Sequence, residues 1–247
     1  MGRLPPMTPN SYGFPGTRGL DYESGVDAAV ITRFFNAVYA WMAAGLALTA
    51  LVAWWVSTRP DIMASVFRGP VIIGLFAAEI VLVIAISAAT QRISPAVATL
   101  LYLLYSAING LTLSGLFFVY AHSTLASAFV VTAGMFGAMS LYGMFTKRDL
   151  TALGGLLFMA LVGLILASVV SIFWRNGVFT TLINYAGVLI FVGLTAYDTQ
   201  KLKYIARATA NDPRAAARLS VNGALALYLD FLNLFLLLLR IMGNRRN

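Results

Sequence analysis

Seven long apolar runs divide this chain and restrict its fold more strongly than any other feature of the sequence. The runs lie at residues 34–57, 70–89, 95–119, 123–145, 151–173, 178–200 and 221–240. Each is close to the length of about 20 residues that an α-helix needs to cross the hydrocarbon core of a bilayer. Transmembrane strands are a poor alternative, because an open sheet cannot satisfy its backbone in lipid and the alternation typical of a barrel is absent. The sequence therefore predicts an all-α bundle of seven transmembrane helices.

The composition agrees with a chain that lies in lipid. Of the 247 residues, 60% are hydrophobic and only 11% are charged, which is too few charges to solvate the surface of a soluble domain. We predict a disordered polar tail over residues 1–30 and one seven-helix transmembrane domain over residues 31–247, with no room for a second domain. The chain contains no cysteine, so disulfides, thiolate metal sites and thiol nucleophiles are excluded.

The basic residues lie between the apolar runs, and seven spans distribute them unevenly over the two sides. One side carries eleven of them: Arg3, Arg18, Arg33, Arg92, Lys147, Arg148, Lys201, Lys203, Arg207, Arg214 and Arg218. The other side carries six: Arg59, Arg68, Arg175, Arg240, Arg245 and Arg246. Cytoplasmic loops hold the excess of Lys and Arg, so the split predicts a cytoplasmic N-terminus. We therefore attribute the net charge of +8 to topology and lipid headgroups, and we expect no nucleic-acid partner.

Three acidic residues, Glu79, Asp198 and Asp230, lie inside the apolar runs or at their ends. An ionisable residue inside a membrane usually faces the bundle interior or a water-filled path. Asp198 has Lys201 three residues further on, so an ordinary same-face ion pair is an alternative for it. Asp230 has no cation within two helical turns, and its carboxyl must be protonated, hydrated or paired with another helix. Glu79 is a candidate for an ion path, but it could equally well form a hydrogen bond across the bundle.

The seven-span topology places Arg92, Asp198 and Asp230 at the same end of the bundle, although the depths of the two aspartates match only loosely. If the two carboxyls meet, they should share one proton and titrate as a coupled pair, which is a pH sensor. When ionised, they would offer a site for transient binding of a hard divalent cation such as calcium, which needs six to eight oxygens and hence carbonyls or water as well. Arg92 paired with the ionised aspartates would hold the second helix against the sixth and seventh, as a gate latch.

Several stretches resemble the transmembrane Bax-inhibitor-motif family, of the Bax inhibitor-1 type. They are AYDTQKL (196–202), ALALYLDFLNLFLLLLRIMG (224–243) and NGLTLSGLFF (109–118), together with a glutamate in the second span. The resemblance implies a seven-helix fold and, for bacterial members, a pH-sensitive calcium leak in the cytoplasmic (inner) membrane. It also implies that Asp198 and Asp230 form the sensor and that Arg92 latches the closed state. Calcium is then the transported ion, and no cofactor is expected. The chain departs from the family pattern in a longer, strongly basic sixth connector over residues 201–220.

Two other classes of protein compete with this interpretation. Intramembrane aspartyl proteases also carry two aspartates on neighbouring helices, and Tyr197-Asp198 resembles their first motif. However, Leu227-Tyr228-Leu229-Asp230 stands where those enzymes carry Gly-x-Gly-Asp, so we expect no enzymatic activity. The second alternative is a non-transporting interaction protein, a modulator or substrate of a membrane protease, for which the polar tail would be suited. Its partner would be that protease or another membrane protein.

Overall fold

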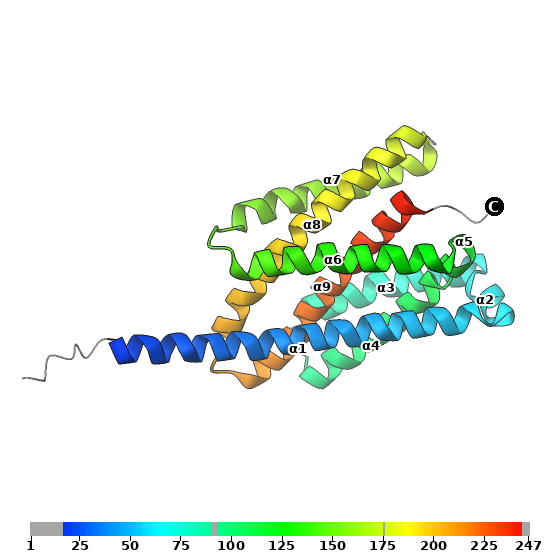
Figure 1. The fold of residues 1–247 in the computed structure, drawn as a ribbon. Helices are drawn as coiled ribbons and strands as arrows, with labels where there is room; N and C mark the ends of the chain where they lie inside the picture. The colour runs from blue at the N-terminus through cyan, green and yellow to red at the C-terminus, as the bar shows by residue number, and fades with distance from the viewer. Residues whose placement is uncertain (1–16, 90–92, 175, 244–247) are drawn as a thin grey trace, which may run out of the picture.

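The structure is a computed structural model that describes the backbone of residues 17–89, 93–174 and 176–243, with side chains from residue 28 on except Ala89. Within these ranges the chain forms nine helices (Figure 1): α1 (Thr17–Ser57), α2 (Pro60–Val66), α3 (Gly69–Ala89), α4 (Pro95–Leu113), α5 (Leu116–Val119), α6 (His122–Phe145), α7 (Thr151–Phe173), α8 (Gly177–Ala208) and α9 (Pro213–Met242). Seven spans in the described ranges are long and apolar enough to cross a membrane, with α4 and α5 forming one of them. The predicted all-α bundle of seven spans is confirmed.

Successive spans run in opposite directions, so the connections alternate between two ends of the bundle. The start of α1, the α6–α7 turn and the α8–α9 turn lie together at one end, whereas α2, α5 and the end of α9 lie at the other (Figure 1). We term the first of these the basic end, because the described Lys and Arg residues are concentrated there: Arg33, Lys147, Arg148, Lys201, Lys203, Arg207, Arg214 and Arg218. This arrangement agrees with the alternation that seven crossings require.

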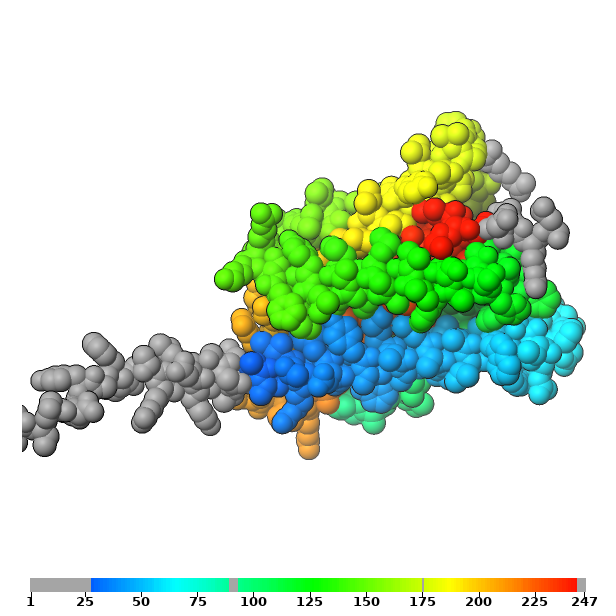
Figure 2. Space-filling view, in the orientation of Figure 1, coloured from blue at the N-terminus to red at the C-terminus, as the bar shows by residue number. Residues whose placement is uncertain are grey.

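Helix α9 occupies the centre of the bundle. More than half of its most apolar window is buried, and it packs against α1, α4, α6 and α8. In the view of Figure 2, α1 and α6 cover most of α9, of which mainly the ends are visible. By contrast, α7 packs mainly on α8, and α3 packs mainly on α4. These two outer helices turn most of their apolar side chains outward, where only lipid can cover them.

Glycine allows two neighbouring helices to approach α8 very closely beside Asp198. A Cβ atom on Gly143 of α6 would lie 2.2 Å from the carbonyl oxygen of Ala196, and one on Gly154 of α7 would lie 2.3 Å from the ring of Tyr197. Only a residue without a side chain permits such backbone approach between membrane helices. The contacts fix α8 against α6 and α7 at the two residues that precede Asp198.

One predicted boundary is wrong. The basic segment 201–220 is not a connector, because α8 continues to Ala208 and α9 begins at Pro213. The carboxylate of Asp212 caps α9 by accepting hydrogen bonds from the backbone N–H groups of Arg214 and Ala215, and proline suits the first helical position. Helix α1 begins at Thr17, within the polar segment 1–30 for which the sequence predicts a disordered tail, and that tail stays a prediction. Residues 1–16 lie outside the described residues.

Candidate functional site

The structure brings Asp198 of α8 and Asp230 of α9 together. Their carboxyl groups lie close enough to interact directly with each other. Two ionised carboxylates at such close range repel each other, which favours a proton on one of the two groups. Asp230 is buried, with 5% of its surface exposed, and Asp198 is half-buried. The aspartate pair, as we term these two residues, therefore has the geometry in which two carboxyls share a proton and titrate together.

One oxygen of the aspartate pair is left without a partner. Asp230 Oδ2 is buried and makes no hydrogen bond. The nearby amide of Asn233 is already engaged, since its Nδ2 donates to the carbonyl of Leu229 at 2.8 Å. The exposed Lys201, three residues further along α8, lies close enough to interact electrostatically with Asp198. A buried acceptor without a donor is a position that a water molecule, a proton or a cation can satisfy.

A large cavity between α7, α8 and α9 contains the aspartate pair in its wall. Its volume is ≈ 840 Å³, and it extends from Lys201 towards the basic end to Arg240 towards the opposite end. The lining residues of α7 run from Gly154 to Ile172, about 27 Å of helix. That length is close to the ~30 Å thickness of the hydrocarbon core. The wall is mainly apolar, and its polar residues are Ser168, Tyr197, Asp198, Lys201, Asp230, Asn233 and Arg240.

Glu79 lies in a different part of the bundle. It is half-buried on α3, and its Oε1 accepts a hydrogen bond of 2.8 Å from the hydroxyl of Thr112 on α4. It also lies close enough to Tyr105 and Tyr228 to interact with them electrostatically. Glu79 is absent from the lining of the cavity that holds the aspartate pair. The hydrogen bond across the bundle, one of the two predicted alternatives for this residue, is present.

Sequence reasoning missed a network of neutral hydroxyl groups on the same side of α9 as Glu79. Thr49 Oγ1 donates to the carbonyl of Ser106 at 2.8 Å and lies 2.6 Å from Tyr228 Oη. Because the single proton of Thr49 is used on Ser106, the tyrosine hydroxyl must be the donor to Thr49. Uncharged polar residues are common in apolar runs and do not by themselves indicate a network. The indication is that such residues from three spans lie together, and this is visible only after folding.

The α6–α7 turn is attached to α8 immediately after Asp198, which the sequence did not predict either. Gln200 Oε1 accepts from the N–H of Leu150 and its Nε2 donates to the carbonyl of Arg148, both at 2.8 Å. In the same turn, Asp149 accepts hydrogen bonds from the hydroxyl and the N–H of Thr151 at 2.6 and 2.9 Å. These bonds lower the pKa of the exposed Asp149 carboxyl below its usual value, so the ionised form is favoured in the folded protein.

Arg92, the predicted latch, lies outside the described residues, and its role stays a prediction. The helix that precedes it, α3, packs mainly against α4 rather than against α8 and α9. In the part of the chain that the structure describes, no three His, Cys, Asp or Glu residues gather closely enough to hold a metal ion. A calcium ion at the aspartate pair would therefore have to complete its oxygen shell with carbonyls and water.

Comparison with known proteins identifies the family. Residues 31–247 match the family described as inhibitor of apoptosis-promoting Bax1. The chain belongs to the Bax inhibitor family. It is 51% identical over 220 residues to the inner membrane protein YbhL of Escherichia coli K12, covering 88% of this chain and 94% of that protein. It is also 43% identical over 219 residues to an uncharacterized protein of Deinococcus radiodurans, covering 88% and 92% of the two chains.

The resemblance to the Bax inhibitor family that the motifs indicated is thereby confirmed. A further relative, an uncharacterized protein of Borreliella burgdorferi, is 42% identical over 216 residues, covering 87% of this chain and 93% of that one. The seven apolar spans and the inner-membrane relative together identify a multi-pass membrane protein. Both residues of the aspartate pair lie within the matched range.

Proposed function

We propose that this Bax inhibitor family protein is a pH-sensitive calcium leak channel of the bacterial inner membrane. The observation that carries the proposal is the aspartate pair in the wall of the cavity between α7, α8 and α9. A buried carboxyl pair in a cavity about as long as the bilayer is thick combines a titratable group with a route for an ion. Calcium is the transported ion in this proposal, and the protein is neither an enzyme nor dependent on a cofactor.

The charge of the aspartate pair gives the leak its pH dependence. With one shared proton the pair carries a single negative charge, and after loss of that proton it carries two. The second charge attracts a divalent cation more strongly, but it also makes the two carboxylates repel each other and favours separation of α8 from α9. Flux therefore depends on pH through two opposed effects on the same groups.

The orientation and the latch are part of the same proposal. The excess of Lys and Arg at the basic end supports a cytoplasmic N-terminus. The aspartate pair then lies nearer to the cytoplasmic opening of the cavity, where Lys201 stands. Arg92 is proposed to latch the closed state by pairing with the ionised carboxyls. We place the ion path at the aspartate pair rather than at Glu79, which has a hydroxyl donor and does not line the cavity.

Calcium flux into liposomes that contain the purified chain tests this proposal. Flux should be measured at one pH below and one pH above neutrality, for the wild type and for Asp230→Asn. The amide has nearly the shape of the carboxyl, so the variant should fold while losing the titrating charge. We expect it to lose both the pH dependence and most of the flux. Glu79→Gln is the control, because it removes a half-buried carboxyl of the bundle that does not line the cavity, and it should retain both.

Two results would contradict the proposal. If the wild type passes no calcium at either pH, the protein is not a leak channel. Association with a membrane protease or another membrane protein would then favour the non-transporting alternative. If the wild type leaks but Asp230→Asn leaves flux and pH response unchanged, the channel exists and the aspartate pair is structural. Thermal unfolding of each variant separates these outcomes from misfolding.

A further inference from the structure

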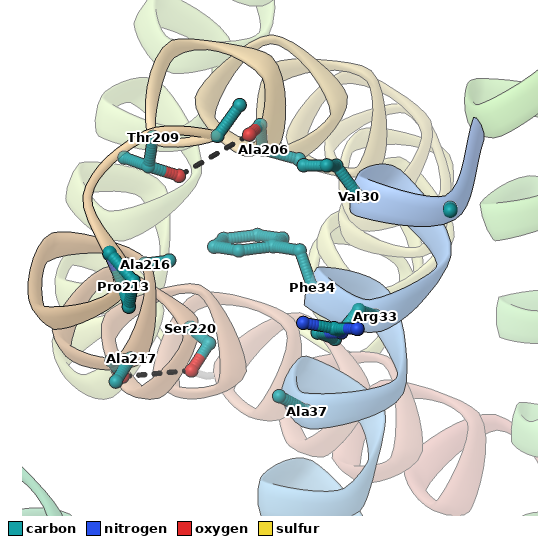
Figure 3. Close-up of a pocket in the computed structure, with 12 residues that line it drawn as sticks. Val30, Arg33, Phe34, Ala37, Ala206, Thr209, Pro213, Ala216, Ala217 and Ser220 are labelled. Atoms are coloured by element: carbon teal, nitrogen blue, oxygen red, sulfur yellow. Dashed lines mark hydrogen bonds between the residues drawn. The ribbon is translucent and has the colours of Figure 1, made fainter. Parts of the chain in front are cut away.

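A second cavity lies at the basic end, away from the aspartate pair. Its volume is ≈ 490 Å³, and it is enclosed by the first part of the apolar span of α1, the end of α8 and the start of α9. Six of its twelve lining residues are alanines. Figure 3 shows the ring of Phe34 projecting from α1 into the space below the α8–α9 turn. Because small side chains leave this space between three helices, the cavity has apolar walls of the kind that accept a hydrocarbon chain.

Among the side chains that line this cavity, only Arg33 offers a charge to a ligand. Thr209 donates its hydroxyl to the carbonyl of Ile205, and Ser220 donates to that of Ala217, each at 2.8 Å, so both hydroxyl protons are used within their own helices. Arg33 is exposed and is the sole charged residue among the twelve that line the cavity. A ligand of this cavity should therefore pair an apolar body with a group that an arginine recognises.

The surroundings of the cavity add to this positive charge. The segment 201–220, which forms the α8–α9 turn and the helix ends beside it, contains five Lys and Arg residues and a single acid, Asp212. That acid is already engaged, because its Oδ1 accepts hydrogen bonds from the N–H groups of Arg214 and Ala215 at 3.1 and 3.0 Å. Arg214 is exposed. The local charge is complementary to an anion rather than to a neutral or zwitterionic group.

We propose that this cavity is a binding site for an anionic phospholipid. The phosphate would pair with Arg33 and the neighbouring Arg214, and one acyl chain would occupy the alanine-lined space between α1 and the α8–α9 turn. Basic pockets between transmembrane helices at the headgroup level bind anionic lipids in this way. A soluble phosphate would leave the apolar walls uncovered. The bound lipid would join α1 to the two helices that carry the aspartate pair, but the site does not depend on the proposed calcium leak.

Thermal unfolding of the purified full-length chain in a neutral detergent provides the test. Three additives should be compared: phosphatidylglycerol, phosphatidylcholine with the same acyl chains, and glycerol phosphate as a headgroup without a tail. We expect phosphatidylglycerol to raise the unfolding temperature in a saturable manner and the other two to have little effect. An equal effect of phosphatidylcholine would overturn the proposal in favour of general lipid solvation. An equal effect of glycerol phosphate would show a simple anion site instead.

Two variants test the two halves of the site separately. Arg33→Gln removes the charge at the rim, and Ala216→Leu fills the cavity while it leaves every charge in place. Each should raise the phosphatidylglycerol concentration for half-saturation about five-fold or more. Arg68→Gln is the control, because Arg68 is an exposed arginine at the other end of the bundle. Half-saturation that is unchanged in both cavity variants would overturn the proposal. The lipid-induced shift is measured against each variant's own baseline, so loss of intrinsic stability does not obscure the result.

Discussion

Two polar groups on opposite sides of α9, those of Tyr228 and Asp230, differ in whether they have hydrogen-bond partners. Tyr228 and Asp230 are two residues apart, which places them about 200° apart around the helix. Towards α1 and α4, Tyr228 is fully buried and its hydroxyl lies 2.6 Å from Thr49 Oγ1. Towards α7 and α8, Asp230 lines a cavity of ≈ 840 Å³ and keeps one oxygen without a hydrogen bond. Because the Tyr228 hydroxyl has its partner, we term its side of α9 the satisfied side; because Asp230 lines the cavity and keeps an unpaired oxygen, we term its side the open side.

This difference separates structural polar groups from functional ones. A buried hydroxyl that has its partner contributes about 1 kcal/mol to stability, whereas a buried polar group without a partner reduces stability by about 1–3 kcal/mol. The Tyr228 hydroxyl therefore needs no explanation beyond the fold. The Asp230 side lowers stability unless a proton, water or cation occupies it, which is the behaviour expected of a site that binds and releases something.

The largest effect should come from breaking the aspartate pair one residue at a time. Asp198→Asn and Asp230→Asn should each remove the pH dependence of calcium flux, because neither variant retains two carboxyls that share a proton. The double variant should change little beyond either single one, with a coupling of about 0.5–3 kcal/mol between the two sites. The measurement is flux in liposomes over a range of pH values. Strictly additive effects would mean that the two carboxyls act independently despite their contact.

The next largest effect is expected from a substitution that disturbs the open side and leaves both carboxyls in place. Gly143→Ala would place a Cβ atom 2.2 Å from the carbonyl oxygen of Ala196, so α6 and α8 must move apart. We expect a loss of about 1–3 kcal/mol in unfolding free energy and a reduced flux, because Asp198 lies two residues further along α8. Gly137→Ala on the same helix meets nothing within 4 Å and should be neutral or stabilising by up to about 1 kcal/mol. Thermal unfolding that treats both variants alike would contradict this difference.

A smaller effect is expected on the satisfied side. Tyr228→Phe removes the hydroxyl that donates to Thr49 and keeps the ring, which contacts Tyr102 and Tyr105 edge to face. The unfolding free energy should fall by about 1 kcal/mol, while calcium flux and its pH dependence stay as in the wild type. Denaturation and liposome flux on the same preparation measure both. A changed pH response would show that the two sides of α9 are coupled and that Tyr228 is not purely structural.

The features that the sequence predicted well are those that the membrane dictates. Lipid forces long apolar runs into helices, so seven spans could be predicted from run length alone. The aspartate pair was also a sequence-based hypothesis, because a carboxyl in an apolar run has few alternatives to a partner. The structure places the two carboxyls close enough to interact, beside the close crossings of α8 with α6 and α7. For these crossings the sequence is ambiguous. Gly143 and Gly137 look the same in the chain, yet only Gly143 lies at a close crossing.

The predicted boundary between the sixth and seventh spans is wrong for a related reason. A boundary predicted from the length of the apolar run ends this helix before the first lysine, Lys201. In the structure α8 continues, because Leu202 and Ala206 still bury their side chains against the bundle. An amphipathic helix end at the membrane surface is invisible to a criterion based on hydropathy. The hydroxyl network of Thr49 and Tyr228 was missed because neutral polar residues carry no sign that distinguishes a buried network from isolated hydroxyls.

The smallest effect concerns Asp149, at the start of the helix that bounds the open side. Hydrogen bonds from the Thr151 hydroxyl and N–H lower the pKa of this carboxyl. A lowered native pKa stabilises the fold above the unfolded pKa, and the stabilisation disappears as the pH falls through the native value. Asp149→Asn should therefore reduce the unfolding temperature slightly at neutral pH and not in acid, and high salt should weaken the effect because the group is exposed. Thr151→Val should reproduce most of the loss, and a deficit of Asp149→Asn that persists in acid would exclude the ionised carboxylate as its cause.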